Sequence, residues 1–284
     1  MLRLFGPLIA PIVGLGFIAA LILAIITASY ESEPATAAHE FHLHPKPLHL
    51  ASDGMLGKFD RQQLQRGFQV YKEVCSACHS ARLVAFRDLS EIGFTVPEVK
   101  AIAKNWATEV PSVNPETGEP ATRKALPSDY IPSPYANETA ARAANNNALP
   151  PDLSLITKAR EGGAPYVHSL LTGYRDPNTY RNEKGEALPA DAKPSANLHF
   201  NPYYANLNFA MPPPLVADGQ VSYADGTKAS VDQMAQDVSA FLVWTAEPKL
   251  ENRHRTGVAV VIFLLIATTL AYFSYQNIWA GRKH

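Results

Sequence analysis

The amino-acid sequence predicts a mainly α-helical globular domain with long irregular insertions, flanked by transmembrane helix anchors. Three observations lead to this fold class. Uncharged apolar runs lie near both ends of the chain, amphipathic helical patterns lie between them, and 23 prolines are spread over the 284 residues. Regular strand alternation is weak throughout. We therefore expect helices and long loops rather than a large sheet.

The N-terminal apolar run covers residues 4–30 without a charge. A retained transmembrane helix over 1–30 is favoured, because signal peptides need an apolar core of only about 7–15 residues. A cleaved signal is the alternative, with the small residues at 35–37 as its cleavage site. Both interpretations place residues 31–254 on the exported side.

Residues 31–52 are rich in proline, alanine and histidine. Their irregular histidine spacing favours a solvated linker over a metal site. The globular domain is expected over 53–250. Residues 31–252 contain 26 acidic and 20 basic side chains, a net charge of −6. That charge favours solubility or a basic partner, and no nucleic-acid partner is expected.

The stretch from Asp60 to Cys78 has a helical pattern. Asp60 is a suitable N-cap, and Gly67 allows a second helix to approach closely. Apolar positions recur at spacings of four, three, four and three, at Leu64, Phe68, Tyr71, Cys75 and Cys78. One face of this helix is therefore expected to be buried.

A second strong helix is expected from Ser230 to Thr245. Ser230 and Gln233 have the spacing of a capping box, and Pro248 ends the pattern. This helix is expected to pack across the first one. Shorter helices are predicted at 97–106 and 164–171, and long loops at 108–135 and 175–206.

The C-terminal apolar run has no charge from Thr256 to Gly281. It is long enough to span a bilayer, which takes about 20 residues. We expect a transmembrane helix over 256–279, with aromatic residues near its end and Arg282-Lys283 on the cytoplasmic side.

The motif Cys75-Ser76-Ala77-Cys78-His79 contains both cysteines of the chain. The pattern C-x-x-C-H indicates covalent attachment of one c-type haem through two thioethers, with His79 as the proximal iron ligand. A thioredoxin-like site would need a preceding strand, whereas a helical pattern precedes this motif. A zinc site would need further ligands at suitable spacing.

A sixth iron ligand separates an electron carrier from an open, reactive haem. Met211 begins the run Met-Pro-Pro-Pro-Leu, where consecutive prolines stiffen the backbone and can hold a side chain in place. Met1, Met55 and Met234 are less suitable by position. Met211 is therefore the predicted axial ligand, and a methionine that merely packs in a loop is the alternative.

These features together resemble the cytochrome c1 family, which supplies the haem subunit of the bacterial type of cytochrome bc1 complex (ubiquinol–cytochrome c reductase). The resemblance runs from about residue 57 to the C-terminus. It is carried by Arg66–Tyr71 before the C-x-x-C-H motif, Ala141–Asn146, Leu149–Ser154, Leu170–Tyr174, Asn201–Tyr203, Met211–Pro213 and Trp244–Pro248.

The resemblance implies an electron-transfer subunit that is no enzyme on its own. Its haem would accept an electron from the Rieske iron-sulfur protein and pass it to a soluble or membrane-tethered cytochrome c. Cytochrome b would be a further partner, in a dimeric complex of the bacterial inner membrane with the haem domain in the periplasm. A stand-alone membrane-anchored shuttle or an oxidase subunit is the alternative, and an open-haem enzyme or gas sensor is a more distant one.

The resemblance also implies roles for single residues. It makes Met211 the axial ligand with His79, and it places Arg142 near a haem propionate, which a guanidinium can bind with two hydrogen bonds. Apart from the resemblance, the acidic loop residues Glu109, Glu116 and Glu119 are candidates for docking a basic partner, and a merely solvated loop is the alternative. One departure is that some relatives have a disulfide in the middle segment, for which this chain has no cysteines.

Overall fold

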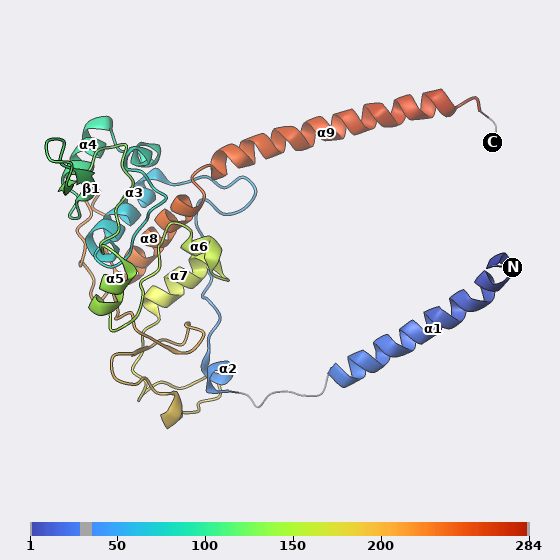
Figure 1. Ribbon diagram of the computed structural model, residues 1–284, viewed down its shortest axis with the longest axis horizontal. Coiled ribbons are helices and arrows are strands. Elements are labelled where there is room, and N and C mark those ends of the chain that lie inside the picture. The colour runs from blue at the N-terminus through green and yellow to red at the C-terminus, as the bar shows by residue number, and fades with distance from the viewer. Residues whose placement is uncertain (1, 29–35, 283–284) are drawn as a thin grey trace.

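The computed structural model describes residues 2–28 and 36–282, and it is mainly helical (Figure 1). Helix α9 (Leu250–Trp279) extends away from the globular body. Among the described residues it is the helix that is long and apolar enough to cross a membrane, and its apolar stretch is not buried against the rest of the molecule. The expected C-terminal anchor is therefore one continuous helix, which starts earlier than predicted, at Leu250.

Helix α1 (Leu2–Ala28) precedes the globular body. Its side chains are described at 13–27, where they are exposed. The first residue, residues 29–35 and the last two residues lie outside the described part, and with them Met1, Ala35 of the alternative cleavage site and Lys283. The choice between a retained helix and a cleaved signal stays a prediction.

The core is built on α3 (Arg61–Val70) and α8 (Val231–Ala246), which cross at Gly67. A Cβ atom at Gly67 would lie 2.0 Å from the Asp237 carbonyl oxygen and 2.7 Å from Phe241 Cβ. Only glycine lets the two backbones come this close. The predicted close approach at Gly67 is confirmed.

Both core helices begin where the sequence predicted. The Asp60 carboxylate accepts hydrogen bonds from the amides of the first turn of α3. Ser230 Oγ accepts one from the Gln233 amide at 3.1 Å. The Gln233 side chain, however, donates to Asp237 instead of reaching back to Ser230, so one half of the expected capping box forms.

The end of the first helix differs from the prediction. The α-helical part stops at Val70, and Tyr71–Cys75 forms a π-helical turn in which the Ser76 amide donates to the Tyr71 carbonyl at 2.8 Å. Ser76 Oγ also donates to the Lys72 carbonyl. The prediction of helix as far as Cys78 was therefore wrong over its last three residues, because these bonds close the helix before them.

Smaller helices pack around this crossing. Helix α7 (Gly163–Thr172) and α4 (Val96–Lys104) confirm the two short helices that the sequence predicted. Sequence reasoning missed the 3-10 helix Phe86–Ile92, α5 (Glu138–Ala144), α6 (Ile156–Ala159) and the short 3-10 turn Ala190–Ala192. Aromatic rings fill the centre of the core, namely Phe68, Tyr71, Phe86, Phe94, Trp106, Phe241 and Trp244.

The first predicted long loop contains a small antiparallel sheet, and the second contains one strand of another. Strands β1 (Val110–Val113) and β2 (Pro120–Arg123) form a hairpin in the first. Strands β3 (His199–Phe200) and β4 (Asn208–Phe209) pair at the end of the second. Strands this short leave almost no alternation in the sequence, which explains why they were not predicted.

The segment expected to be a solvated linker packs against the domain over its described residues 36–52. It contains α2 (Ala37–Phe41), and Phe41 is buried. The Leu43 amide donates to the Pro202 carbonyl at 2.8 Å, and the Lys46 amide donates to Ser169 Oγ at 2.8 Å. In the part of the chain that is described, no three His, Cys, Asp or Glu side chains come together as a metal-binding group.

Candidate haem site

The C-x-x-C-H motif follows directly on the π-helical turn. The amides of Cys78 and His79 both donate to the Cys75 carbonyl, at 3.1 and 2.9 Å, so the motif forms a tight turn. Both thiols are free. Burial, and next the neighbouring Cys78, raise the pKa of Cys75 to about 12. Cys75 is therefore a protonated thiol at neutral pH, which does not suit the thiolate chemistry of a redox-active C-x-x-C pair.

The His79 ring is fixed by a backbone carbonyl. Its Nδ1 lies 2.8 Å from the Pro151 oxygen, which can only accept, so Nδ1 carries the proton and donates. Burial lowers the pKa of His79, against the opposing effects of the Pro151 hydrogen bond and of Asp152. The ring is therefore neutral at pH 7, with Nε2 as the nitrogen left to bind a metal.

Asp152 joins the segment after His79 to the segment after Pro151. Its carboxylate accepts hydrogen bonds from Ser80 Oγ at 2.7 Å, from the Arg82 amide at 2.9 Å and from the Ser154 amide at 3.0 Å. Burial would raise the pKa of Asp152, but these hydrogen bonds outweigh it and hold the pKa below its ordinary value. The ionised carboxylate therefore fixes the loop that carries the Pro151 carbonyl.

Arg142 lies on a helix whose end contacts Tyr135, and Tyr135 in turn lies next to Cys78. Burial raises the pKa of Tyr135, the hydrogen bond from Asn145 opposes this, and the adjacent Cys78 thiol raises it further. Asn145 Nδ2 donates to the Tyr135 hydroxyl at 2.9 Å and ends α5, the helix that carries Arg142. The exposed Arg142 guanidinium donates to the Asn147 carbonyl at 3.0 Å.

Met211 is held in a second assembly. The Tyr174 hydroxyl lies 3.0 Å from the Met211 carbonyl and 3.3 Å from the Pro212 carbonyl. The Tyr174 ring stacks on Phe209, with centroids 5.6 Å apart, and Phe209 stacks in turn on Tyr204. Burial raises the pKa of Tyr174, so its hydroxyl remains a donor. This one side chain therefore fixes the backbone at the predicted ligand.

Two of the sequence motifs, Leu170–Tyr174 and Asn201–Tyr203, contact each other near the Tyr174 side chain that holds Met211. Asn201 is fully buried and donates to the Leu170 carbonyl at 2.8 Å, and its own Oδ1 accepts from the Tyr203 amide. A Cβ atom at Gly173 would lie 2.4 Å from the Tyr203 ring. The end of α7 is thereby locked to the 201–203 turn, and Tyr174 follows directly.

The described residues fit a c-type haem. Two free thiols, a neutral imidazole with Nε2 available and a methionine on a fixed loop form the donor set that such a group needs. The structure brings Cys75, Cys78 and His79 together in one turn, and it links Arg142 to that turn through Tyr135. No hydrogen bond joins Met211 to that turn within the described residues.

Sequence reasoning missed the supporting roles of Tyr135, Asp152 and Tyr174. The sequence did contain one signal for Asp152. Asp-x-Ser is a turn pattern, and the two prolines before it have no amide hydrogen to donate. No comparable local pattern marks Tyr135 or Tyr174, because each acts on a residue far along the chain.

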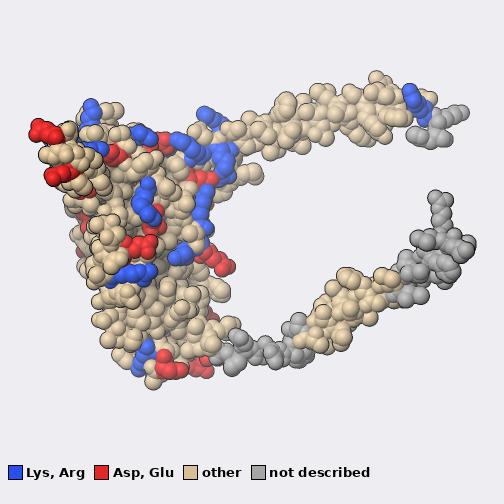
Figure 2. Space-filling model, in the orientation of Figure 1, with Lys and Arg blue, Asp and Glu red and all other residues tan. Residues whose placement is uncertain are grey.

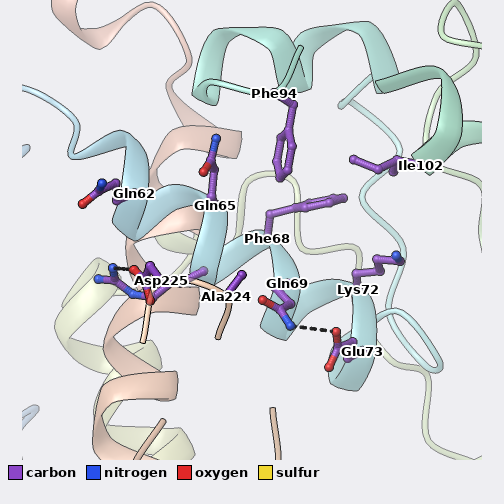
Figure 3. Close-up of a pocket in the computed structure, with 11 residues that line it drawn as sticks. Gln62, Gln65, Phe68, Gln69, Lys72, Glu73, Phe94, Ile102, Ala224 and Asp225 are labelled. Atoms are coloured by element: carbon purple, nitrogen blue, oxygen red, sulfur yellow. Dashed lines mark hydrogen bonds and ion pairs between the residues drawn. The ribbon is translucent and has the colours of Figure 1, made fainter. Parts of the chain in front are cut away.

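A surface groove on α3 is a separate feature (Figure 3). One side of the groove is lined by α3, Phe94 and Ile102, and the other side is lined by Ala224 and Asp225. Arg66 at its edge pairs with Asp225 at 2.7 Å and with the buried Asp237 at 2.9 Å. None of the predicted haem residues lines this groove, so we do not assign it to the haem site.

The profile of the Cytochrome C1 family matches residues 50–282 of the chain. Cytochrome c1 of Rhodospirillum rubrum is 41% identical over 276 residues, which are 94% of this chain and 96% of that protein. The mitochondrial cytochrome c1 heme protein of Saccharomyces cerevisiae is 45% identical over 255 residues, covering 90% of this chain and 78% of that protein.

A third relative is named as part of a larger assembly. The mitochondrial cytochrome b-c1 complex catalytic subunit of Candida albicans is 42% identical over 265 residues. These residues are 91% of this chain and 88% of that protein.

Proposed function

Since this chain belongs to the cytochrome c1 family, we propose that it is the electron-transfer haem subunit of a cytochrome bc1 complex. The observation that carries the proposal is the fixed imidazole of His79, whose Nδ1 donates to Pro151 while Nε2 stays available next to two free thiols. Family membership itself implies a c-type haem, and the finer assignments below rest on the geometry of the chain.

Cys75 and Cys78 would attach the haem through thioethers, and His79 and Met211 would be its axial ligands. When bound, the haem supplies a one-electron couple. Burial keeps the His79 ring neutral, the hydrogen bond to Pro151 fixes its orientation, and Tyr174 holds the Met211 backbone. With both residues bound to the iron, no position would be left for a substrate, which would suit a carrier rather than a catalyst.

Arg142 is proposed to bind a haem propionate. Its guanidinium is exposed and makes its hydrogen bond to a backbone carbonyl, so it is available to a carboxylate. Its helix is tied by Asn145 and Tyr135 to the position of Cys78. The support for this assignment is this chain of contacts, which brings the Arg142 segment to the cysteine side of the site.

The domain would be anchored by α9, over about 256–279, with residues 53–250 as the periplasmic haem domain of a bacterial inner-membrane protein. Family membership and the apolar α9 support membrane anchoring. Helix α1 would be a second anchor if it is retained. The two basic residues at 282–283 favour a cytoplasmic C-terminus.

The electron donor would be the Rieske iron-sulfur protein, and the acceptor a cytochrome c. Cytochrome b would complete a dimeric complex, which as a whole is the oxidoreductase. Acidic side chains gather around the exposed β1–β2 hairpin, where Glu116 and Glu119 lie (Figure 2). Attraction of a basic partner by such a surface should weaken as salt is raised.

Replacing Met211 tests the proposed ligand. Met211→Leu in the purified complex should turn a low-spin ferrous haem that does not bind carbon monoxide into one that binds it readily. Met234→Leu is the matched control, because Met234 is buried in the α3–α8 core. A wild-type protein that already binds carbon monoxide, or an unchanged spectrum for Met211→Leu, would contradict the ligand assignment.

Purification in mild detergent tests the assembly. We expect a b-type cytochrome and a Rieske protein to copurify with the chain in constant ratio. Recovery of the haem protein without either one would favour a stand-alone shuttle or an oxidase subunit instead.

A further inference from the structure

The two most exposed large apolar side chains described in the molecule are neighbours. Met55 is 80% exposed and Leu56 is 76% exposed, at the tip of the loop that precedes α3. This loop projects from the globular body beside the first turns of α9 (Figure 1). Contiguous exposed apolar surface can mark a site of contact with another protein or with a membrane.

The loop has a defined shape. The Asp53 amide donates to the Leu50 carbonyl at 3.0 Å, and the Lys58 amide donates to the Ala51 carbonyl at 2.9 Å, which closes the loop at its base. A Cβ atom at Gly57 would lie 2.2 Å from the Ser52 carbonyl oxygen, so the two arms touch backbone to backbone. The tip is therefore presented in a fixed position.

Side-chain contacts fix the loop against α9. His254 Nδ1 lies 3.2 Å from the Gly57 carbonyl and donates to it, and the Phe59 amide donates to Glu251 at 2.8 Å. His254 comes four residues before Val258, where the uninterrupted apolar core of the run begins, which is about 6 Å along a helix. Each interfacial zone of a bilayer is about 5–8 Å deep, so a hydrocarbon boundary at Val258 would place the tip at the depth of that zone.

Basic side chains surround the same place. Lys58 and Arg255 are exposed, Arg253 is exposed and pairs with Glu247, and Lys and Arg residues gather where α9 leaves the globular body (Figure 2). Cationic side chains at this depth can bind lipid phosphates, while apolar side chains among them enter the boundary of the acyl chains. Continuity with α9 and this charge pattern both favour a lipid surface as the partner.

We propose that the Met55-Leu56 loop is a membrane-contact site, which inserts its two apolar side chains into the bilayer surface at the point where α9 enters. This inference rests on the proposed span of α9. The contact would add a second point of attachment and so set the tilt of the haem domain above the membrane, which a single helix does not fix.

Depth measurements by spin labelling test this site. Met55→Cys and Leu56→Cys would be labelled separately with a nitroxide in the complete complex, reconstituted in nanodiscs of phosphatidylcholine and phosphatidylglycerol. Both positions are exposed, so the label should leave folding and the haem spectrum unchanged. Wild type, whose thiols are in thioethers under the proposed function, gives the labelling background.

Two reference positions make the result decisive. Leu265→Cys reports the middle of α9, and Val113→Cys reports the β1–β2 hairpin, at 64% and 60% exposure in the wild-type chain. We expect the ratio of oxygen to nickel-chelate collisions at 55 and 56 to exceed that at 113 at least threefold. A ratio equal to that at 113, or exclusion of both reagents by a covering subunit, would overturn the inference. Water exposure at 265 would instead overturn the span of α9.

Discussion

The two sides of the candidate haem site are held in different ways. On the His79 side, the Pro151 carbonyl and the Asp152 carboxylate bind the ring and the backbone that follows it. On the Met211 side, the hydroxyl of Tyr174 holds the carbonyls of Met211 and Pro212. The first side is continuous with the core through α3, whereas the second is a loop held by one side chain.

This difference predicts unequal stability. Segments held by many buried contacts open only with the whole domain, whereas segments held by a few exposed bonds open locally. The His79 side should therefore fail together with the fold. The Met211 side should loosen while the domain stays folded. A mutation there would therefore affect the proposed Met211 ligand and leave the stability of the domain nearly unchanged.

The largest expected effect is at the helix crossing that supports the His79 side. Gly67→Ala places a Cβ atom 2.0 Å from the Asp237 carbonyl oxygen, so α3 and α8 must move apart. Overpacking of this kind costs about 1–3 kcal/mol, and contact with rigid backbone places it near the upper end. Urea unfolding followed by haem absorbance and by circular dichroism should show both signals lost together at lower urea.

Gly257→Ala is the control for Gly67→Ala, because nothing lies within 4 Å of its Cβ position. It should leave the urea midpoint unchanged. If Gly67→Ala unfolds at the wild-type midpoint, the crossing does not limit the stability of the His79 side.

A smaller loss is expected from Asp152→Asn. Both carboxylate oxygens accept hydrogen bonds, so an amide must turn its NH2 group toward a donor. Leaving donors unsatisfied costs about 1–3 kcal/mol. The lowered pKa of Asp152 means that its contribution is complete well above the ordinary value of 3.8 and is lost as pH falls through the lower folded value.

The difference in unfolding free energy between wild type and Asp152→Asn should therefore be full at pH 7 and shrink below about pH 4. Denaturation at a series of pH values measures it. Asp191→Asn, at an exposed position, is the control. A difference that stays constant from pH 7 to pH 3 would show that the charge of Asp152 does not matter.

The smallest effect is expected from Tyr174→Phe. The ring can still stack on Phe209, but the hydrogen bonds to the Met211 and Pro212 carbonyls are lost, at about 0.5–1.5 kcal/mol. Carbon monoxide should bind the ferrous protein several-fold more readily, while the urea midpoint changes little. Tyr204→Phe keeps its stacking on Phe209 and should behave as wild type. Equal behaviour of both variants would remove the proposed role of the Tyr174 hydroxyl.

The sequence predicted the parts of the molecule that depend on local pattern. The caps at Asp60 and Ser230 and the close approach at Gly67 follow from residues within one or two helical turns. The Cys75–His79 motif likewise lies within five consecutive residues, and the structure brings its two thiols and its imidazole together in one turn. The contacts of Tyr135 with Cys78 and of Tyr174 with Met211 were not predictable, since these partners lie dozens of residues away and only the folded chain brings them together.

The packed N-terminal segment shows the same limit. Its proline and histidine content suggested a solvated linker, yet Phe41 is buried and Lys46 meets Ser169. A short segment without its own periodicity gives no sign of the surface that will cover it.

The π-helical turn at Tyr71–Cys75 has a consequence for insertions and deletions. A π-turn contains one residue more than a regular turn, and one residue rotates an α-helix by about 100°. Deleting one residue between 71 and 75 would restore regular α-helical bonding and leave the helix almost as long. Both thiols and the imidazole would then keep nearly the same direction, because the chain completes one turn in either case. The π-turn can therefore absorb the loss of one residue, whereas a deletion within the regular helix α3 would rotate the motif by about 100°.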